Sequence, residues 1–206
     1  MAHRPEARPG PGRPSSGARE RVLAAGLEVL KAEGYAGLTT AKVAARSGQN
    51  KALIAYHFGS KQGLVAAVGR EVAESITDEV LGQLERTTTT EQVIRGVLDG
   101  LWRVLERDER LARLYFDLAA VSVVEPDVRA VMQEMKETWR QVLGALLAGA
   151  DDGPTKRDAE AATVYVIAAI EGLALERLDR GETSALKRAR ELFVRSAVSA
   201  ISLPRP

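Results

Sequence analysis

The stretch TTAKVAARSGQNKALIAYHF, residues 39–58, holds two short apolar segments separated by a glycine, Gly48. A chain that turns sharply at this point can need a positive φ, which glycine adopts at the least cost. We therefore expect one helix over 40–47, which Thr39 or Thr40 caps, and a second helix over 50–57. Small residues around the turn let the two helices approach closely, and this arrangement is typical of a helix-turn-helix.

The second helix of the pair has two distinct faces. Ile54 and Phe58 are spaced i and i+4 and can both face the core. The remaining side chains then face outward, where the N-terminal part of such a helix enters the DNA major groove. They form the candidate DNA-contacting set: Gln49, Asn50, Lys51, Ala52, Leu53, Ala55, Tyr56 and His57.

This outward set offers three kinds of contact. Polar side chains can read base edges: Gln49, Asn50 and Lys51. Small apolar side chains can contact a thymine methyl group: Ala52, Leu53 and Ala55. Hydroxyl and imidazole groups can donate to phosphates: Tyr56 and His57.

Two further candidates lie at expected helix N-termini, where the helix dipole favours an anion. These are Thr40 and Lys61. Taken singly, Lys51 and Lys61 are better explained as solvated surface residues, and Tyr56 as a packed side chain. The combination on one face favours contact with double-stranded DNA.

Charge is unevenly distributed along the 206 residues, although the net charge is only +1. Residues 1–62 hold ten Lys or Arg and four Glu, a net +6, whereas the other 144 residues carry −5. A basic head on a mildly acidic body favours a polyanion-binding module joined to a module that binds a ligand or a partner.

The first 18 residues are rich in proline and poor in large apolar side chains, so we expect a flexible basic arm there. Gly12–Pro14 resembles the core of minor-groove AT-hook segments, and Arg4, Arg8 and Arg13 could follow a narrow groove. A purely solubilising tail is an equally good interpretation.

The rest of the chain favours an all-α fold, because aromatic residues are only 4% and alternating apolar patterns are missing. We expect a helix-turn-helix domain over 19–66 and a helical ligand-sensing and dimerisation domain over 67–206. Helix breakers predict about nine helices: 19–33, 40–47, 50–57, 60–86, 90–107, 109–122, 126–148, 156–180 and 184–202.

Several functional classes are excluded by composition. The chain has no cysteine and two histidines, His3 and His57, so we expect no metal site and no cofactor. It also has no glycine-rich phosphate loop and no HExxH motif, which argues against an enzyme. The longest nearly uncharged apolar run, Ala161–Ile170, is half of what a membrane span needs. With no signal peptide at the start, we expect a soluble cytoplasmic protein.

The expected body contains aromatic and acidic residues that could line a small-molecule pocket, although ordinary core packing also explains each aromatic. The candidates are Trp102, Tyr115, Phe116, Asp117, Trp139, Tyr165 and Glu171. Glu171 interrupts an apolar run, so its carboxylate needs a partner, water, a cationic ligand or an exposed edge.

The expected helix around 160–177 is apolar almost all round, which predicts burial against a second copy of the chain. We expect this helix and the last one to form a four-helix interface in a homodimer. The candidate interface residues are Tyr165, Ala168, Gly172, Leu175, Phe193, Val194 and Val198.

Residues 17–77 resemble the DNA-binding domain of TetR-type transcriptional regulators. The resemblance is carried by Gly34-Tyr35, Thr39-Thr40, the Val43–Gly48 run, Lys51, Tyr56-His57-Phe58, Ser60-Lys61 and Leu64. It implies a helical homodimer that binds an operator with two-fold symmetry and a C-terminal domain that senses a ligand. Family members usually carry Thr in place of Leu53 and Tyr in place of Ala55, and both typically help to hold the DNA backbone. The resemblance therefore does not imply these two phosphate contacts for this chain, and it implies a more apolar groove face.

The region around Leu114–Asp117 and Trp139 is similar to the choline-sensing, BetI-like branch of that family. This implies a shared shape and does not identify choline as the ligand. The leading hypothesis is a DNA-binding transcriptional regulator, a repressor that a small molecule releases. The alternative is an architectural DNA-binding or protein-interaction module without a ligand pocket.

Overall fold

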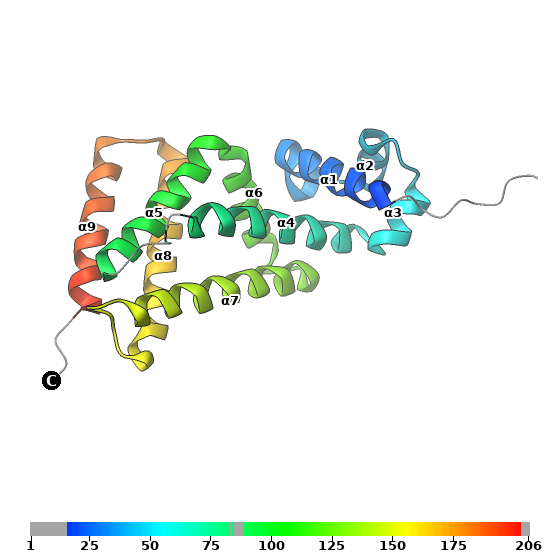
Figure 1. Ribbon diagram of the computed structural model, residues 1–206. Helices are drawn as coiled ribbons and strands as arrows, with labels where there is room; N and C mark the ends of the chain where they lie inside the picture. Colours follow the sequence, from blue (N-terminus) through cyan, green and yellow to red (C-terminus); the bar gives the residue numbers. More distant parts are fainter. Residues whose placement is uncertain (1–15, 83, 85–88, 203–206) are drawn as a thin grey trace, which may run out of the picture.

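The computed structural model describes residues 16–82, 84 and 89–202, and these consist of helices joined by turns and loops, with no strand among them (Figure 1). The described helices are α1 (Ser16–Gly37), α2 (Thr40–Ser47), α3 (Lys51–Phe58), α4 (Lys61–Leu81), α5 (Thr90–Arg107), α6 (Glu109–Val121), α7 (Pro126–Gly149), α8 (Lys156–Arg180) and α9 (Ser184–Ile201). The all-α prediction is therefore confirmed. Among these helices, none has a run long and apolar enough to cross a bilayer.

Most helix boundaries lie within two residues of those expected from the sequence, with differences at α1 and α4. The α1 assignment begins at Ser16, inside the expected arm, and runs on past a break at Gly34. The predicted helix over 60–86 was too long, because α4 ends at Leu81 with Gly82 as its C-cap. The proposed minor-groove residues of the arm, Arg4, Arg8 and Arg13, lie outside the described residues.

Side-chain caps fix the starts of the helices in the head, as the sequence predicts. The Thr39 hydroxyl accepts a hydrogen bond from the backbone N–H of Lys42, which settles the choice between Thr39 and Thr40. The Asn50 side chain accepts from the N–H of Leu53 at 2.7 Å. These bonds satisfy N–H groups that the first turn of a helix leaves without intrahelical partners.

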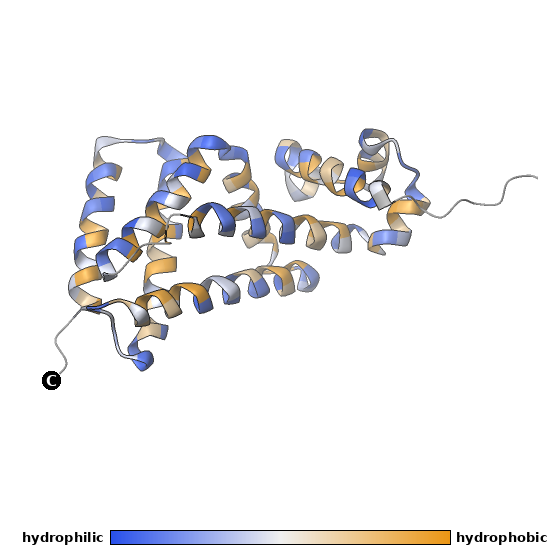
Figure 2. Ribbon diagram, in the orientation of Figure 1, coloured by the Kyte–Doolittle hydropathy of each residue, from blue (hydrophilic) through white to orange (hydrophobic). Residues whose placement is uncertain are grey.

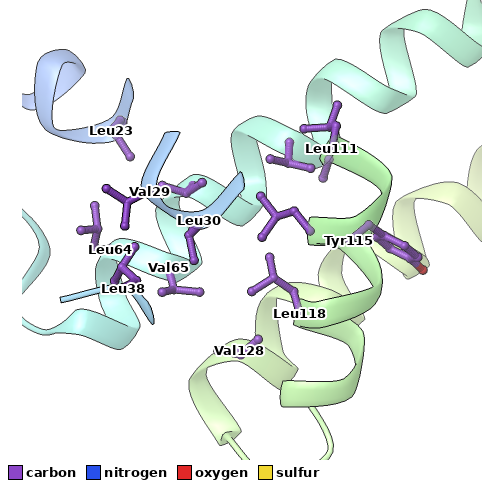
Figure 3. Close-up of a cluster of buried hydrophobic side chains, with 14 of the residues drawn as sticks. Leu23, Val29, Leu30, Leu38, Leu64, Val65, Leu111, Tyr115, Leu118 and Val128 are labelled. Carbon is purple, nitrogen blue, oxygen red and sulfur yellow. The ribbon is translucent and has the colours of Figure 1, made fainter. Parts of the chain in front are cut away.

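Helix α4 belongs to both halves of the molecule and runs from the head into the body beside α7 (Figure 1). Its first turns pack against α1 through Leu64 and Val65, while α6 and α7 contribute Leu118 and Val128 to the same cluster (Figure 3). Figure 2 shows apolar residues recurring along α4 and α7, where these helices lie side by side. The head therefore shares one apolar core with the near part of the body.

A second apolar cluster joins α5, Ala112 of α6 and the C-terminal part of α7 to α8 and α9. Val166 and Ile170 of α8 and Val194 of α9 are buried in it. Leu101 and Phe116 pack against both clusters, so the body is continuous from the head to α9.

A polar joint connects the end of α1 to α6 and α4. Gly34 breaks α1 at φ 68° and ψ −177°, and the next backbone N–H, that of Tyr35, donates to Asp117 Oδ2 at 2.6 Å. The carbonyl of Tyr35 accepts from Lys61 Nζ at 2.8 Å. Burial, followed by the nearby carboxylate of Glu125, raises the pKa of the Tyr35 phenol above its usual value near 10.

Replacing Gly34 by alanine should lower the free energy of unfolding by about 1–3 kcal/mol, because this backbone conformation is almost restricted to glycine. A Cβ would also lie 3.0 Å from Asp117 Oδ2. Urea denaturation followed by circular dichroism measures the change. The matched control is Gly149→Ala, where a Cβ meets no atom within 4 Å. Equal losses in both variants would contradict the expectation.

Candidate functional site

The helix-turn-helix has the geometry that the sequence predicts. Gly48 takes a left-handed conformation, φ 66° and ψ 19°, and so turns the chain between α2 and α3. Val43 of α2 and Ile54 of α3 are buried in the head core, and Phe58 packs against them. The opposite side of α3 is consequently turned outward.

Most of the predicted DNA-contacting residues lie on this outward side of α3. Lys51, Ala52 and Ala55 are exposed, and the Tyr56 ring is 73% exposed. Leu53 is half-buried. An exposed cation, small apolar side chains and a phenol on one short helix are compatible with a groove-binding surface.

The side chains of Gln49 and Asn50, which directly precede α3, make hydrogen bonds within the local turn. Asn50 is exposed, but its Oδ1 caps α3, which leaves its amide N–H groups as donors. Gln49 is half-buried, and its side-chain amide donates to the carbonyl of Ser47 at 3.5 Å. The local turn thus holds both amides close to the start of the exposed helix face.

Three other predicted DNA contacts lie differently from the exposed set. The Nε2 atom of His57 is buried and has no hydrogen-bond partner among the described residues, so it does not point outward. Lys61 donates to Tyr35 and its ammonium lies 4.2 Å from the centre of that ring. Thr40 is half-buried in the first turn of α2. His57 and Lys61 are turned away from the exposed side of α3 because α3 and α4 pack tightly onto the head core.

The body encloses an apolar cavity between α4, α5, α6, α7 and α8. Four predicted pocket residues line it: Tyr115, Phe116, Trp139 and Glu171. The sequence did not single out the aliphatic lining, which resembles ordinary core in its periodicity: Ile76, Val80, Val97, Leu101, Val104, Val142, Leu146 and Ile167. Thr77 of α4 was also missed, since nothing in the sequence distinguishes it from a surface threonine.

A polar corner of this cavity is built from α6, α7 and α8. The Tyr115 hydroxyl donates to Glu171, and Lys136 Nζ lies 2.9 Å from Glu171 Oε1 and 3.2 Å from Oε2. Burial of the phenol, followed by the charge of Glu171, raises the pKa of Tyr115 far above its usual value near 10. Glu171 thus has two partners, Tyr115 and Lys136, as expected for a carboxylate within an apolar run.

Three predicted pocket residues lie outside the cavity, which corrects that part of the sequence-based set. Trp102 is buried among α5, α8 and α9, and its Nε1 donates to Glu182 at 2.9 Å. Asp117 points to the joint with α1, where it accepts from Tyr35. Tyr165 is 42% exposed on α8. Helical rotation explains these positions, because neighbours in sequence project 100° apart around a helix.

The predicted dimer residues also divide into two groups. Phe193 and Val194 are buried inside the subunit, so they do not form an exposed surface and this part of the prediction is corrected. Val198 is half-buried, and its place in the interface stays a prediction. The others are exposed on one side of α8. Two further exposed apolar residues were not in the prediction: Val164 of α8 and Leu192 of α9. This surface, called the α8 face below, consists of Val164, Tyr165, Ala168, Gly172, Leu175 and Leu192 of α9.

Comparison with protein families identifies both halves of the chain. Residues 22–68 match the family of bacterial regulatory proteins, tetR family, and residues 90–201 match the C-terminal domain of BetI-type transcriptional repressors. The chain belongs to the TetR family. It is accordingly a transcriptional regulator that binds DNA, as the resemblance in residues 17–77 implied.

Individual relatives agree with this TetR assignment. The transcriptional regulator CymR of Pseudomonas putida is 28% identical over 185 residues, which cover 85% of this chain and 90% of CymR. A transcriptional regulator from Rhodococcus sp. Rha1 has the same fold, with a TM-score of 0.75 at 20% identity over 91% of this chain and 99% of that one. The structure of the multidrug binding protein EbrR complexed with imidazole has a TM-score of 0.67 at 24% identity. The match covers 91% of this chain and 96% of the EbrR chain.

Replacing Tyr115 by phenylalanine in this TetR-family protein should lower the free energy of unfolding at pH 8 by about 1–3 kcal/mol, because Glu171 loses a buried donor. The raised pKa means that the folded state holds the phenol proton more tightly than the unfolded chain does. The stabilisation is therefore complete below a pH of about 10 and declines as the pH rises above it.

Urea unfolding at pH 8 and pH 10.5 should show a smaller difference between wild type and Tyr115→Phe at the higher pH. Tyr56→Phe is the control, since Tyr56 is 73% exposed on α3. A difference that stays constant or grows with pH would argue against the buried Tyr115–Glu171 bond.

Proposed function

We propose that this TetR-family regulator is a homodimeric repressor that binds an operator with two-fold symmetry and leaves it when a small molecule enters the body. The observation that carries the proposal is a single α6 helix that lines the cavity and also holds the DNA-binding head. The match to BetI-type repressors supports repression. Binding to chromosomal DNA implies a cytoplasmic location.

The proposed DNA surface is the outward side of α3. Lys51 lies at the start of the helix with its ammonium exposed, and Tyr56 extends one turn further along. Lys51 supplies a phosphate or guanine contact, and Tyr56 supplies a phosphate donor. With Leu53 and Ala55 in place of the usual Thr and Tyr, the groove face contains more apolar surface.

The proposed dimer forms through the α8 face. Its five α8 residues recur at i, i+3 and i+4 spacing, so they form one apolar strip along α8. Burying this strip against a second copy removes it from water and places two helices from each chain in one bundle. Figure 1 shows α9 at the end of the molecule opposite α3, so such pairing leaves both α3 helices free to reach successive major grooves.

The proposed ligand response travels through three consecutive residues of α6. Tyr115 and Phe116 line the cavity, while Asp117 holds the backbone of Tyr35 at the end of α1. The carbonyl of Tyr35 in turn holds Lys61, which begins α4 directly after the groove-binding helix. A ligand that shifts α6 thereby shifts the head, and a coupling of about 1–3 kcal/mol would weaken DNA binding about 5- to 150-fold.

Replacing Lys51 by alanine should weaken binding to the operator, because each lost phosphate contact leaves counterions on the DNA. Binding is measured by fluorescence anisotropy on a duplex from the region upstream of the protein's own gene, over a series of salt concentrations. The slope of log association constant against log salt concentration should become less steep by about 0.9 for each lost phosphate contact. Lys187→Ala on α9 is the control and should bind as wild type does. Equal binding of wild type to this duplex and to a scrambled one would contradict specific regulation.

Replacing Leu175 by glutamate should split the dimer, since it places a charge on the apolar α8 face, where Leu175 is 53% exposed in one subunit. Light scattering after size exclusion should give the mass of two chains for wild type and of one chain for the variant. Val124→Glu is the matched control, because Val124 is 76% exposed but lies between α6 and α7. A wild-type protein that is monomeric at micromolar concentration would contradict the proposed dimer.

A further inference from the structure

The charge balance of the cavity decides what kind of molecule it can hold. Among the cavity-lining residues that the structure describes, Glu171 alone carries a charge. Both of its carboxylate oxygens face Lys136 Nζ, at 2.9 Å and 3.2 Å, and the Tyr115 hydroxyl donates to the same carboxylate. The negative charge is therefore matched inside the protein before any ligand arrives.

The other polar groups of the lining are also paired. Trp139 Nε1 donates to Thr77 Oγ1 at 2.7 Å, and the Thr77 hydroxyl donates to the carbonyl of Ala73 at 2.7 Å. A ligand would gain little from hydrogen bonds here and would have to break existing ones to obtain them. A ligand would therefore bind mainly through contact with the apolar side chains of the cavity and through fit to its shape.

The aromatic side chains of the cavity do not form an open cage for a cation. The Tyr115 ring packs on Trp139 at 5.7 Å between centroids and edge-on against Phe116 at 5.1 Å. The Lys136 ammonium already lies 6.0 Å from the centre of the Tyr115 ring. A second cation at this corner would be repelled by Lys136, would find Glu171 already paired and would lose its hydration.

We infer that the cavity takes an uncharged, predominantly hydrocarbon molecule, and that Lys136 is the residue that excludes organic cations from it. This inference rests on the proposed function, in which the cavity is the effector site. Lys136 acts by neutralising Glu171 and is not itself part of the lining. Removing its charge without changing its length should convert the corner into a site for a cation.

Two molecules of nearly the same shape test the inference directly: tert-butylbenzene, which is uncharged, and phenyltrimethylammonium, which carries one positive charge. Binding to the full-length protein is measured without DNA, as the rise in melting temperature over a concentration series. Wild type should be stabilised by tert-butylbenzene and not by an equal concentration of phenyltrimethylammonium. Equal or stronger stabilisation by the cation, or none by the hydrocarbon up to its solubility, would overturn the inference.

The variant Lys136→Met should bind phenyltrimethylammonium at least about tenfold more tightly than wild type, since the repelling charge is gone and Glu171 is freed. Its affinity for tert-butylbenzene should change by less than about threefold, which also shows that the variant is folded. Lys156→Met, an exposed lysine at the start of α8, is the matched control and should keep the wild-type preference. A folded Lys136→Met variant that still rejects the cation would contradict the role of Lys136.

Adding the operator duplex separates this inference from the proposed function. If tert-butylbenzene binds but DNA affinity does not change, the proposed release mechanism fails and the ligand class stands. If operator binding is specific and wild type nevertheless prefers the cation, the ligand class fails and regulation of this DNA stands.

Discussion

Shared packing of α4 is the constraint on which the rest of the molecule depends. The start of this helix completes the core of the DNA-binding head, and its remainder forms a wall of the body cavity. The helix lies beside α7 along much of its length (Figure 1). Because close-packed apolar contacts resist small displacements, the head cannot reorient without a change in the helices that surround the cavity.

The polar joint around Tyr35 gives this packing a defined geometry. Apolar contacts hold α1 against α6 but are not directional, whereas a backbone N–H on a carboxylate fixes both position and angle. Asp117 lies directly after two cavity-lining residues on the same helix. In a protein that links ligand binding to DNA binding, a short connection of this kind needs no separate signalling element.

The cavity and the α8 face show how similar sequence patterns serve different purposes. Both are apolar stripes of helical periodicity, but one is enclosed by five helices and the other faces solvent within one subunit. The paired charges at Glu171 make the enclosed stripe neutral, which suits an uncharged occupant. The exposed stripe includes two small residues, Ala168 and Gly172.

The sequence by itself determined the all-α class, the helix-turn-helix with its caps and the outward side of α3, because short-range periodicity and capping fix these locally. Four of its candidate pocket residues, Tyr115, Phe116, Trp139 and Glu171, line the cavity. Only the tertiary structure decided that Asp117 ties α6 to α1, that Phe193 and Val194 are internal, and that Lys136 neutralises Glu171. Periodicity within one helix identifies an apolar face, but which neighbour covers that face depends on how distant helices pack.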